Sequence, residues 1–129
     1  MRVGFIGLGT MGASMALNAQ KAKHELIVND LRREAAAPHI KNGAVWADSP
    51  RAVAEKSEVI LTSLPGPREV EAIADDLLAG MQKGAAWFDL STNSPTVVRR
   101  LAARFAEKGF AMLDAPVSGG PAGAKSGKL

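Results

Sequence analysis

The chain has 129 residues, of which 47% are hydrophobic and 22% charged, and its formal charge is +3. This length suits one domain with one hydrophobic core, and no apolar run approaches the roughly 18 residues of a membrane span. Dispersed basic residues and few aromatic ones argue against nucleic-acid binding, and the absence of cysteine excludes disulfides and thiolate chemistry. Without cysteine or a secretory leader, the sequence favours a cytoplasmic protein.

The first predicted element is a strand over residues 2–6, which leads directly into Gly7, Gly9 and Gly12. This spacing is typical of a dinucleotide-binding turn, whose glycines permit a tight turn, leave room for the pyrophosphate and let the next helix pack closely. Helical periodicity follows over 11–22, and the positive end of that helix would face the phosphates. Because ordinary loops also contain glycine triplets, the neighbouring elements determine whether this triplet indicates a dinucleotide-binding turn.

A second strand is predicted over residues 25–30 and ends on Asp30. A carboxylate roughly 20 residues after the glycine turn is expected to hydrogen-bond the adenosine ribose of a bound dinucleotide. Strand, glycine turn, helix, strand and acid therefore occur in the order of a dinucleotide-binding unit.

The rest of the chain continues the alternation. Further strands are predicted over residues 44–46, 58–63, 85–90 and 110–114, and further helices over 32–42, 50–56, 67–79 and 95–108. Serine–proline pairs predict helix N-caps at Ser49 and Ser94. Glycines predict helix ends at Gly43, Gly80 and Gly109.

Alternating helices and continuous apolar strands predict an α/β fold of Rossmann type, a doubly wound parallel sheet of about six strands covered on both faces. With strand order 3-2-1-4-5-6, a ligand binds beyond the carboxyl ends of the first and fourth strands. The segments 7–12 and 64–67 should therefore meet over one cofactor. The loops 89–95 and 114–120 fall on the same edge, where their hydroxyls and amides suit either ligand binding or an ordinary turn with a helix cap.

Two motifs carry a more specific signal. Residues 5–18, Phe-Ile-Gly-Leu-Gly-Thr-Met-Gly-Ala-Ser-Met-Ala-Leu-Asn, and residues 114–120, Asp-Ala-Pro-Val-Ser-Gly-Gly, resemble the N-terminal signature and the substrate loop of the β-hydroxyacid dehydrogenases. This family includes 3-hydroxyisobutyrate dehydrogenase and tartronate semialdehyde reductase, and its dinucleotide domain is similar to that of 6-phosphogluconate dehydrogenase. The resemblance spans the whole chain. It implies an NAD(P)-dependent oxidoreductase that interconverts a small 3-hydroxy acid and its semialdehyde or keto form.

The resemblance also implies individual roles. The expected cofactor contacts are Gly7, Leu8, Gly9, Thr10, Met11 and Gly12 at the pyrophosphate, Asn29 and Asp30 at the adenosine ribose, Leu64 and Pro65 at the middle of the cofactor, and Thr92 near the nicotinamide ribose. The expected substrate-carboxylate contacts are Ser118, Gly119 and Gly120. No metal site is expected.

The family's catalytic lysine belongs to a later helix, so the resemblance implies no catalytic residue within this chain. Lys125 and Lys128 lie too early and are expected to be flexible, solvated and inert. We therefore expect residues 1–129 to be the dinucleotide-binding domain without the family's C-terminal helical domain, and to be inactive alone. Relatives dimerise through those later helices, so a homo-oligomer is expected of a full-length protein.

Asp30 favours NAD, because its carboxylate would repel the 2′-phosphate of NADP. Leu31 supports NAD as well, since NADP-preferring relatives commonly carry arginine there. NADP stays open because Arg32 and Arg33 could bind that phosphate. Isolated His24 and His39 are expected at the surface or at strand edges.

Three rival functions remain at this stage. The first is a non-catalytic dinucleotide-binding or signalling module, and the second is a relative of the imine reductases, which share much of this domain. The third is a methyltransferase that binds S-adenosylmethionine at the glycine loop, although it leaves the loop 114–120 unexplained.

Overall fold

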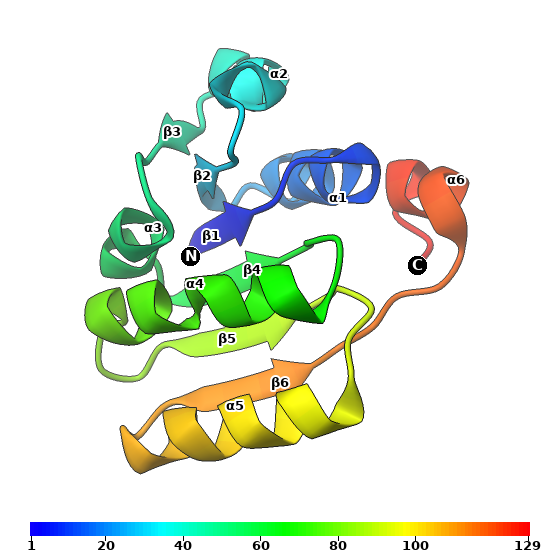
Figure 1. The fold of residues 1–129 in the computed structure, drawn as a ribbon. Helices are drawn as coiled ribbons and strands as arrows, with labels where there is room; N and C mark the ends of the chain where they lie inside the picture. Colours follow the sequence, from blue (N-terminus) through cyan, green and yellow to red (C-terminus); the bar gives the residue numbers. More distant parts are fainter.

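Six parallel strands form one sheet in the order β3-β2-β1-β4-β5-β6, in a computed structural model that describes residues 1–129 (Figure 1). The strands are β1 (Arg2–Ile6), β2 (Glu25–Asn29), β3 (Val45–Trp46), β4 (Val59–Thr62), β5 (Ala86–Asp89) and β6 (Ala111–Asp114). The predicted strand order is confirmed. The order reverses between β1 and β4, and this reversal opens a crevice for ligands in such sheets.

Helices alternate with the strands. They are α1 (Thr10–Lys21), α2 (Ala37–Lys41), α3 (Pro50–Lys56), α4 (Pro67–Gly80), α5 (Pro95–Glu107) and α6 (Gly120–Ser126), with a 3₁₀ turn η1 (Arg33–Ala36) before α2. The span predicted as one helix over 32–42 is therefore broken. Pro38 explains the break, because proline is tolerated only in the first turn of a helix and so marks a new start. None of the helices has the length and apolar character needed to cross a membrane.

Two hydrophobic clusters hold the helices on the sheet. The larger lies between the sheet and α3, α4 and α5 and includes Trp87 and Phe105, whose ring centroids are 4.9 Å apart. The smaller joins β1 and β2 to α1 and includes Phe5 and Val28. On β6, Met112 is buried in the larger cluster with α5, whereas Leu113 on the opposite face is 46% exposed, so the helical cover predicted for both faces is present on only one face at that edge.

The predicted helix ends are confirmed in part. The Ser49 hydroxyl accepts a hydrogen bond from the Ala52 amide at 3.0 Å and caps α3. Ser94 is the N-cap residue of α5, as predicted, but its side chain makes no capping hydrogen bond, and the Ser94 amide donates to Asn93 Oδ1 at 2.7 Å. Gly43 and Gly109 follow their helices in the left-handed conformation expected of C-terminal glycines.

Gly80 is a packing residue as well as the end of α4. It keeps a right-handed backbone, and a Cβ there would overlap the Arg51 carbonyl oxygen and lie 3.0 Å from the Ala54 Cβ. Only glycine therefore allows α4 to approach α3 this closely.

The surface position predicted for His39 is wrong. The side chain is fully buried between α2 and α1, where Nε2 lies 2.9 Å from the Ala13 carbonyl oxygen. The His39 carbonyl in turn accepts a hydrogen bond from Gln20 Nε2 at 3.0 Å. His39 thus fastens α2 to α1, and His24 is exposed as expected.

The helix α6 was not predicted, and Lys125 lies within it rather than in a flexible tail. The Asn18 side chain of α1 donates a hydrogen bond of 2.6 Å to the Ala124 carbonyl of α6. This carbonyl is among the last of the helix, which have no partner within it. A tertiary contact with α1 therefore stabilises a glycine-rich segment that has weak helical propensity of its own.

The close approach at Gly80 yields a stability prediction. Gly80→Ala should lower the free energy of unfolding by about 1–3 kcal/mol, because the new methyl group overpacks the α3–α4 contact. Urea denaturation followed by circular dichroism measures this. Gly66→Ala, at the other end of α4, is the matched control, since the nearest atom to its Cβ would be 3.9 Å away. Equal losses in the two variants would contradict the account.

Candidate functional site

The glycine turn after β1 is packed against itself and against the end of β4. Gly7 has φ +96°, and a Cβ there would overlap the Ser63 carbonyl oxygen. A Cβ at Gly12 would overlap the Gly7 carbonyl oxygen. These two contacts bring the start of α1 against the sheet at the point where the strand order reverses.

Gly9 differs from its two neighbours, because no atom lies within 4 Å of the position of a Cβ. The first backbone hydrogen bond of α1 runs from the Ala13 amide to the Gly9 carbonyl at 2.9 Å, and no side chain caps the helix. The amides of Thr10 and Met11 precede that bond and have no partner in the helix. Open space therefore lies over free N–H groups at the positive end of a helix, which suits an anion.

Asp30 is fixed beside this turn. Its Oδ2 accepts a hydrogen bond from the Leu8 amide at 2.7 Å, and its Oδ1 accepts one from the Arg32 amide at 2.9 Å. The Leu8 amide thus holds the acid, and the Leu8 side chain is buried. The carboxylate therefore has a fixed position at the end of β2, next to the open amides of α1.

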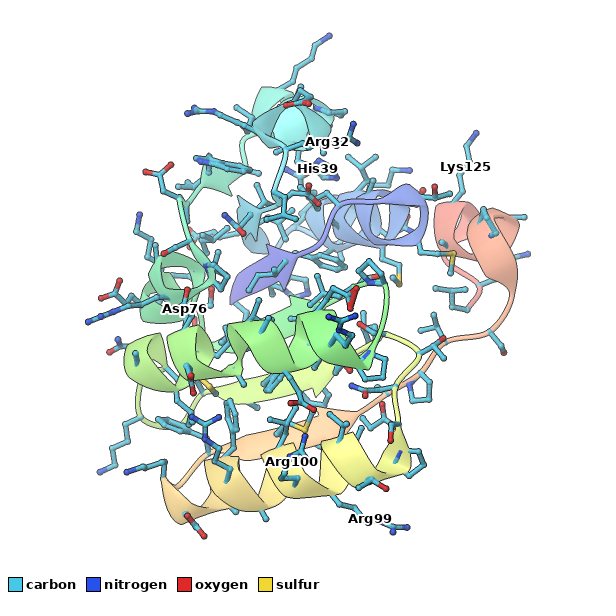
Figure 2. All side chains as sticks on the ribbon, in the orientation of Figure 1. Arg32, His39, Asp76, Arg99, Arg100 and Lys125 are labelled. Atoms are coloured by element: carbon cyan, nitrogen blue, oxygen red, sulfur yellow. The ribbon has the colours of Figure 1, made fainter.

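The residues around Asp30 make different contacts. Asn29 is buried, and its amide donates to the Ala47 carbonyl at 2.8 Å, which ties β2 to the chain after β3. The Arg33 guanidinium lies over the Trp46 ring, 5.6 Å from its centroid. Arg32 is exposed, and Figure 2 shows it close to α2. Of the two arginines, only Arg32 has no such aromatic contact.

The segments after β4 and β5 are joined to each other. The Leu64 amide donates to the Ser91 hydroxyl at 2.8 Å. Pro65 and Thr92, which follow these two residues, are exposed. The segment of Leu64 and Pro65 and the segment of Thr92, both predicted to contact the cofactor, therefore lie side by side at the carboxyl edge.

A buried acid beneath these segments was not predicted. Asp89, the last residue of β5, is fully buried and accepts hydrogen bonds from the Thr62 hydroxyl at 2.9 Å, the Ser91 amide at 3.2 Å and Asn93 Nδ2 at 2.9 Å. Trp87 Nε1 donates to the Thr62 hydroxyl at 2.9 Å. The available signal is a carboxylate at the end of an apolar strand, whereas the prediction from sequence places it only in a polar loop.

The predicted substrate loop continues from β6 into α6. Ser118, Gly119 and Gly120 are exposed, and both glycines have positive φ. Figure 1 shows β1, β4, β5 and β6 pointing toward the same side of the molecule, where the chain after β6 rises to α6 beside α1. In Figure 2, Lys125 extends outward from α6. The loop thus shares an edge with the glycine turn, and Lys125 does not point toward it.

A separate hollow lies elsewhere on the molecule. It has a volume of about 610 Å³ and opens at the amino edge of the sheet, beside Arg2, Glu25 and Gly43. None of the predicted site residues lines it. No group of three or more His, Asp or Glu side chains is placed to hold a metal ion. The candidate site is therefore an open shelf built from loops and helix ends.

The two acids that end β5 and β6 are neighbours in the sheet, since Asp89 pairs with Asp114 in the parallel register. Desolvation, and secondly the negative charge of Asp89, raise the pKa of Asp114 above its ordinary value of 3.8. Asp114 therefore holds its proton more tightly in the folded chain than in the unfolded one.

This raised pKa gives a pH dependence. The stabilising effect of protonated Asp114 is fully present below pH 3.8 and is lost as the pH rises through the folded-state value. Asp114→Asn should therefore raise the thermal midpoint relative to the original chain at pH 7, and the gain should vanish near pH 3. Thermal denaturation across this range measures it, with Asp76→Asn on α4 as the control. The same pH trend in both variants would contradict the raised pKa of Asp114.

Residues 2–129 match the family described as the NAD binding domain of 6-phosphogluconate dehydrogenase. The chain is 43% identical to the NAD-dependent L-serine dehydrogenase of Pseudomonas aeruginosa, over 99% of this chain and 44% of that protein. It superimposes on the 3-hydroxyisobutyrate dehydrogenase of Mycobacterium tuberculosis with L-serine at a TM-score of 0.91 and 34% identity, over 97% of this chain and 43% of that one. Psf3 in complex with NADP+ and 2-OPP gives a TM-score of 0.90 and 36% identity, over 97% and 45%.

The chain thus spans less than half the length of these relatives. The match extends across the glycine turn, the joined segments after β4 and β5, and the loop after β6. The resemblance to hydroxyacid dehydrogenases is confirmed at the level of the family. The chain belongs to the family of the NAD binding domain of 6-phosphogluconate dehydrogenase.

Proposed function

We propose that residues 1–129 bind NAD(H) along the carboxyl edge of the sheet, as the dinucleotide domain of an oxidoreductase that interconverts a small 3-hydroxy acid and its semialdehyde or keto form. One observation carries this proposal. The start of α1 offers free amides under open space at Gly9, and a fixed carboxylate at Asp30 stands beside them. A diphosphate and a ribose diol would find complementary partners there.

The glycine turn binds the diphosphate in this proposal. The amides of Thr10, Met11 and Gly12 donate to it, and Gly9 leaves room for its oxygens to reach the backbone. Gly7 supports this arrangement from below by packing on Ser63. Leu8 contributes by holding Asp30 through its amide.

Asp30 binds the hydroxyls of the adenosine ribose and favours NAD over NADP. Its two oxygens accept hydrogen bonds from backbone amides, so the carboxylate is held in place before the ligand arrives. A 2′-phosphate would meet this negative charge, and the stacking of Arg33 on Trp46 occupies one of the two arginines that could compensate. Asn29 supports the same corner through its bond to Ala47.

Leu64 and Pro65 border the middle of the cofactor in this proposal, and Thr92 lies near the nicotinamide ribose, because their two segments are joined at the carboxyl edge. The nicotinamide, when bound, supplies the hydride chemistry. Ser118, Gly119 and Gly120 hold the substrate carboxylate with a hydroxyl and backbone amides. A loop of this composition suits an acid such as the L-serine named for two of the relatives.

None of these residues is a general acid or base for the substrate hydroxyl, a role that typically contributes 10²- to 10⁴-fold to the rate. We therefore expect the chain to bind dinucleotide with little turnover. A non-catalytic binding module would behave in the same way, and an imine-reductase relative would differ only in its substrate. A methyltransferase would bind S-adenosylmethionine and no NAD, which the family assignment argues against. A cytoplasmic location and a full-length homo-oligomer complete the proposal.

Gly9→Ala tests the diphosphate site. Its backbone, with φ −73°, accepts alanine, and the new methyl group points into open space. We expect the free energy of unfolding to stay within about 1 kcal/mol of the original chain. The affinity for NADH should fall by about tenfold or more, because the methyl group occupies the space of the diphosphate. Isothermal titration calorimetry measures the affinity.

Gly12→Ala is the matched comparison, since a Cβ there overlaps the Gly7 carbonyl and should destabilise the fold as well. Unchanged NADH binding by a folded Gly9→Ala variant would refute the proposed site.

Asp30→Asn tests the choice of cofactor. The original chain should bind NADH about tenfold or more tightly than NADPH, and loss of the negative charge should narrow that ratio. Fluorescence titrations with both reduced dinucleotides provide the two constants. Glu34→Gln, which removes a charge from an exposed side chain of η1, should leave the ratio unchanged. A preference of the original chain for NADPH would contradict the role of Asp30.

A further inference from the structure

Asp89 is a buried acid with no cation beside it. The ion pairs of the chain are Arg2–Glu58, Arg100–Glu71 and Arg104–Asp75, and none involves Asp89. A buried carboxylate is costly unless hydrogen bonds replace its water. Packing alone would favour an apolar residue at the end of a strand whose other buried side chain is Trp87. The reason for a carboxylate at this buried position therefore lies in the groups that it hydrogen-bonds.

These partners come from two segments, the end of β4 and the loop between β5 and α5. The Thr62 hydroxyl belongs to the end of β4, the Ser91 amide to the loop after β5, and Asn93 to the residues just before α5. Each donates to the Asp89 carboxylate, with two bonds to Oδ1 and one to Oδ2. One side chain thus fixes the β5–α5 loop, at two of its residues, against the end of β4.

The bonds continue outward to the predicted cofactor contacts. The Ser91 hydroxyl accepts the Leu64 amide at 2.8 Å, and Asn93 Oδ1 accepts the Ser94 amide at 2.7 Å. Thr92 lies between Ser91 and Asn93, both of which Asp89 holds. The exposed Thr92 is therefore presented by neighbours that are pinned from below.

We propose that Asp89 is a positioning residue that aligns Leu64 and Thr92 for the nicotinamide half of the dinucleotide. This inference rests on the proposed function. Asp89 itself is fully buried and acts through Ser91 and Asn93. The diphosphate and adenosine contacts lie on α1 and β2, so Asp89 affects them much less than it affects the nicotinamide half.

Exchanging the side chains of Asp89 and Asn93 isolates the hydrogen bond between them. In Asp89→Asn, a new NH₂ group faces Asn93 Nδ2, and turning the Asn93 amide around only places its NH₂ against the Ser94 amide. In Asn93→Asp, two carboxylates face each other. Combining Asp89→Asn with Asn93→Asp restores every bond, with the donor and acceptor exchanged only in the bond between positions 89 and 93. The carboxylate at position 93 then accepts from the new amide at position 89 and from the Ser94 amide, while the amide oxygen at position 89 accepts from Thr62 and Ser91.

The experiment compares NADH with ADP, which carries the adenosine and the diphosphate and lacks the nicotinamide half. Calorimetric titrations give both dissociation constants for the original chain, the two single variants and the double variant. Each single change should raise the dissociation constant of NADH by about tenfold, the usual order for one unpaired buried group. The dissociation constant of ADP should rise by less than about twofold. In the double variant, the dissociation constant of NADH should return to within about threefold of the original value.

Two results would overturn the inference. One is an unchanged ratio of the NADH and ADP constants in the single variants, and the other is a double variant no better than either single change. Failure of the original chain to bind ADP would instead remove the proposed function, and this inference with it. If the single variants do not fold, Ser91→Ala decides, because it removes only the acceptor of the Leu64 amide. An unchanged ratio in that variant overturns the inference.

Discussion

The start of α1 lies against the sheet because two glycines remove the side chains that would separate them. A Cβ at Gly7 would overlap the Ser63 carbonyl, and one at Gly12 would overlap the Gly7 carbonyl. Without these contacts, the first turn of α1 could not lie with its free amides beside the carboxyl ends of β1 and β4. The placement of Asp30 depends on the same turn, since the Leu8 amide that holds its carboxylate lies within it. The proposed dinucleotide site is therefore a consequence of backbone packing.

The polar groups of the carboxyl edge are arranged in two tiers. The upper tier is exposed and comprises Gly9, Pro65, Thr92 and Ser118, which are free to meet a ligand. The lower tier is buried and satisfied by hydrogen bonds, chiefly those of Asp89 and Asn29. A buried network whose members are all paired is rigid, whereas exposed loops are usually mobile. This division explains how a shelf made of loops can hold a ligand in one orientation.

The sequence predicted the elements well because strong local signals mark them. Runs of apolar residues bounded by glycine or proline placed the strands of this sheet to within about one residue, as β1 and β4 illustrate. The features that it missed depend on distant contacts. His39 is buried because α2 folds over Ala13, and α6 is helical beside Asn18. Likewise, only the register of β4 with β5 brings Thr62 to Asp89. Residue type and spacing do not reveal such partners.

The central claim is that the open amides of α1 meet a diphosphate. The most direct measurement is a titration of the ¹⁵N-labelled chain with NADH, followed through backbone amide shifts. The account predicts the largest changes at Thr10, Met11 and Gly12, with smaller changes at Leu64 and Thr92. Unchanged shifts at the start of α1, with or without changes elsewhere, would contradict it.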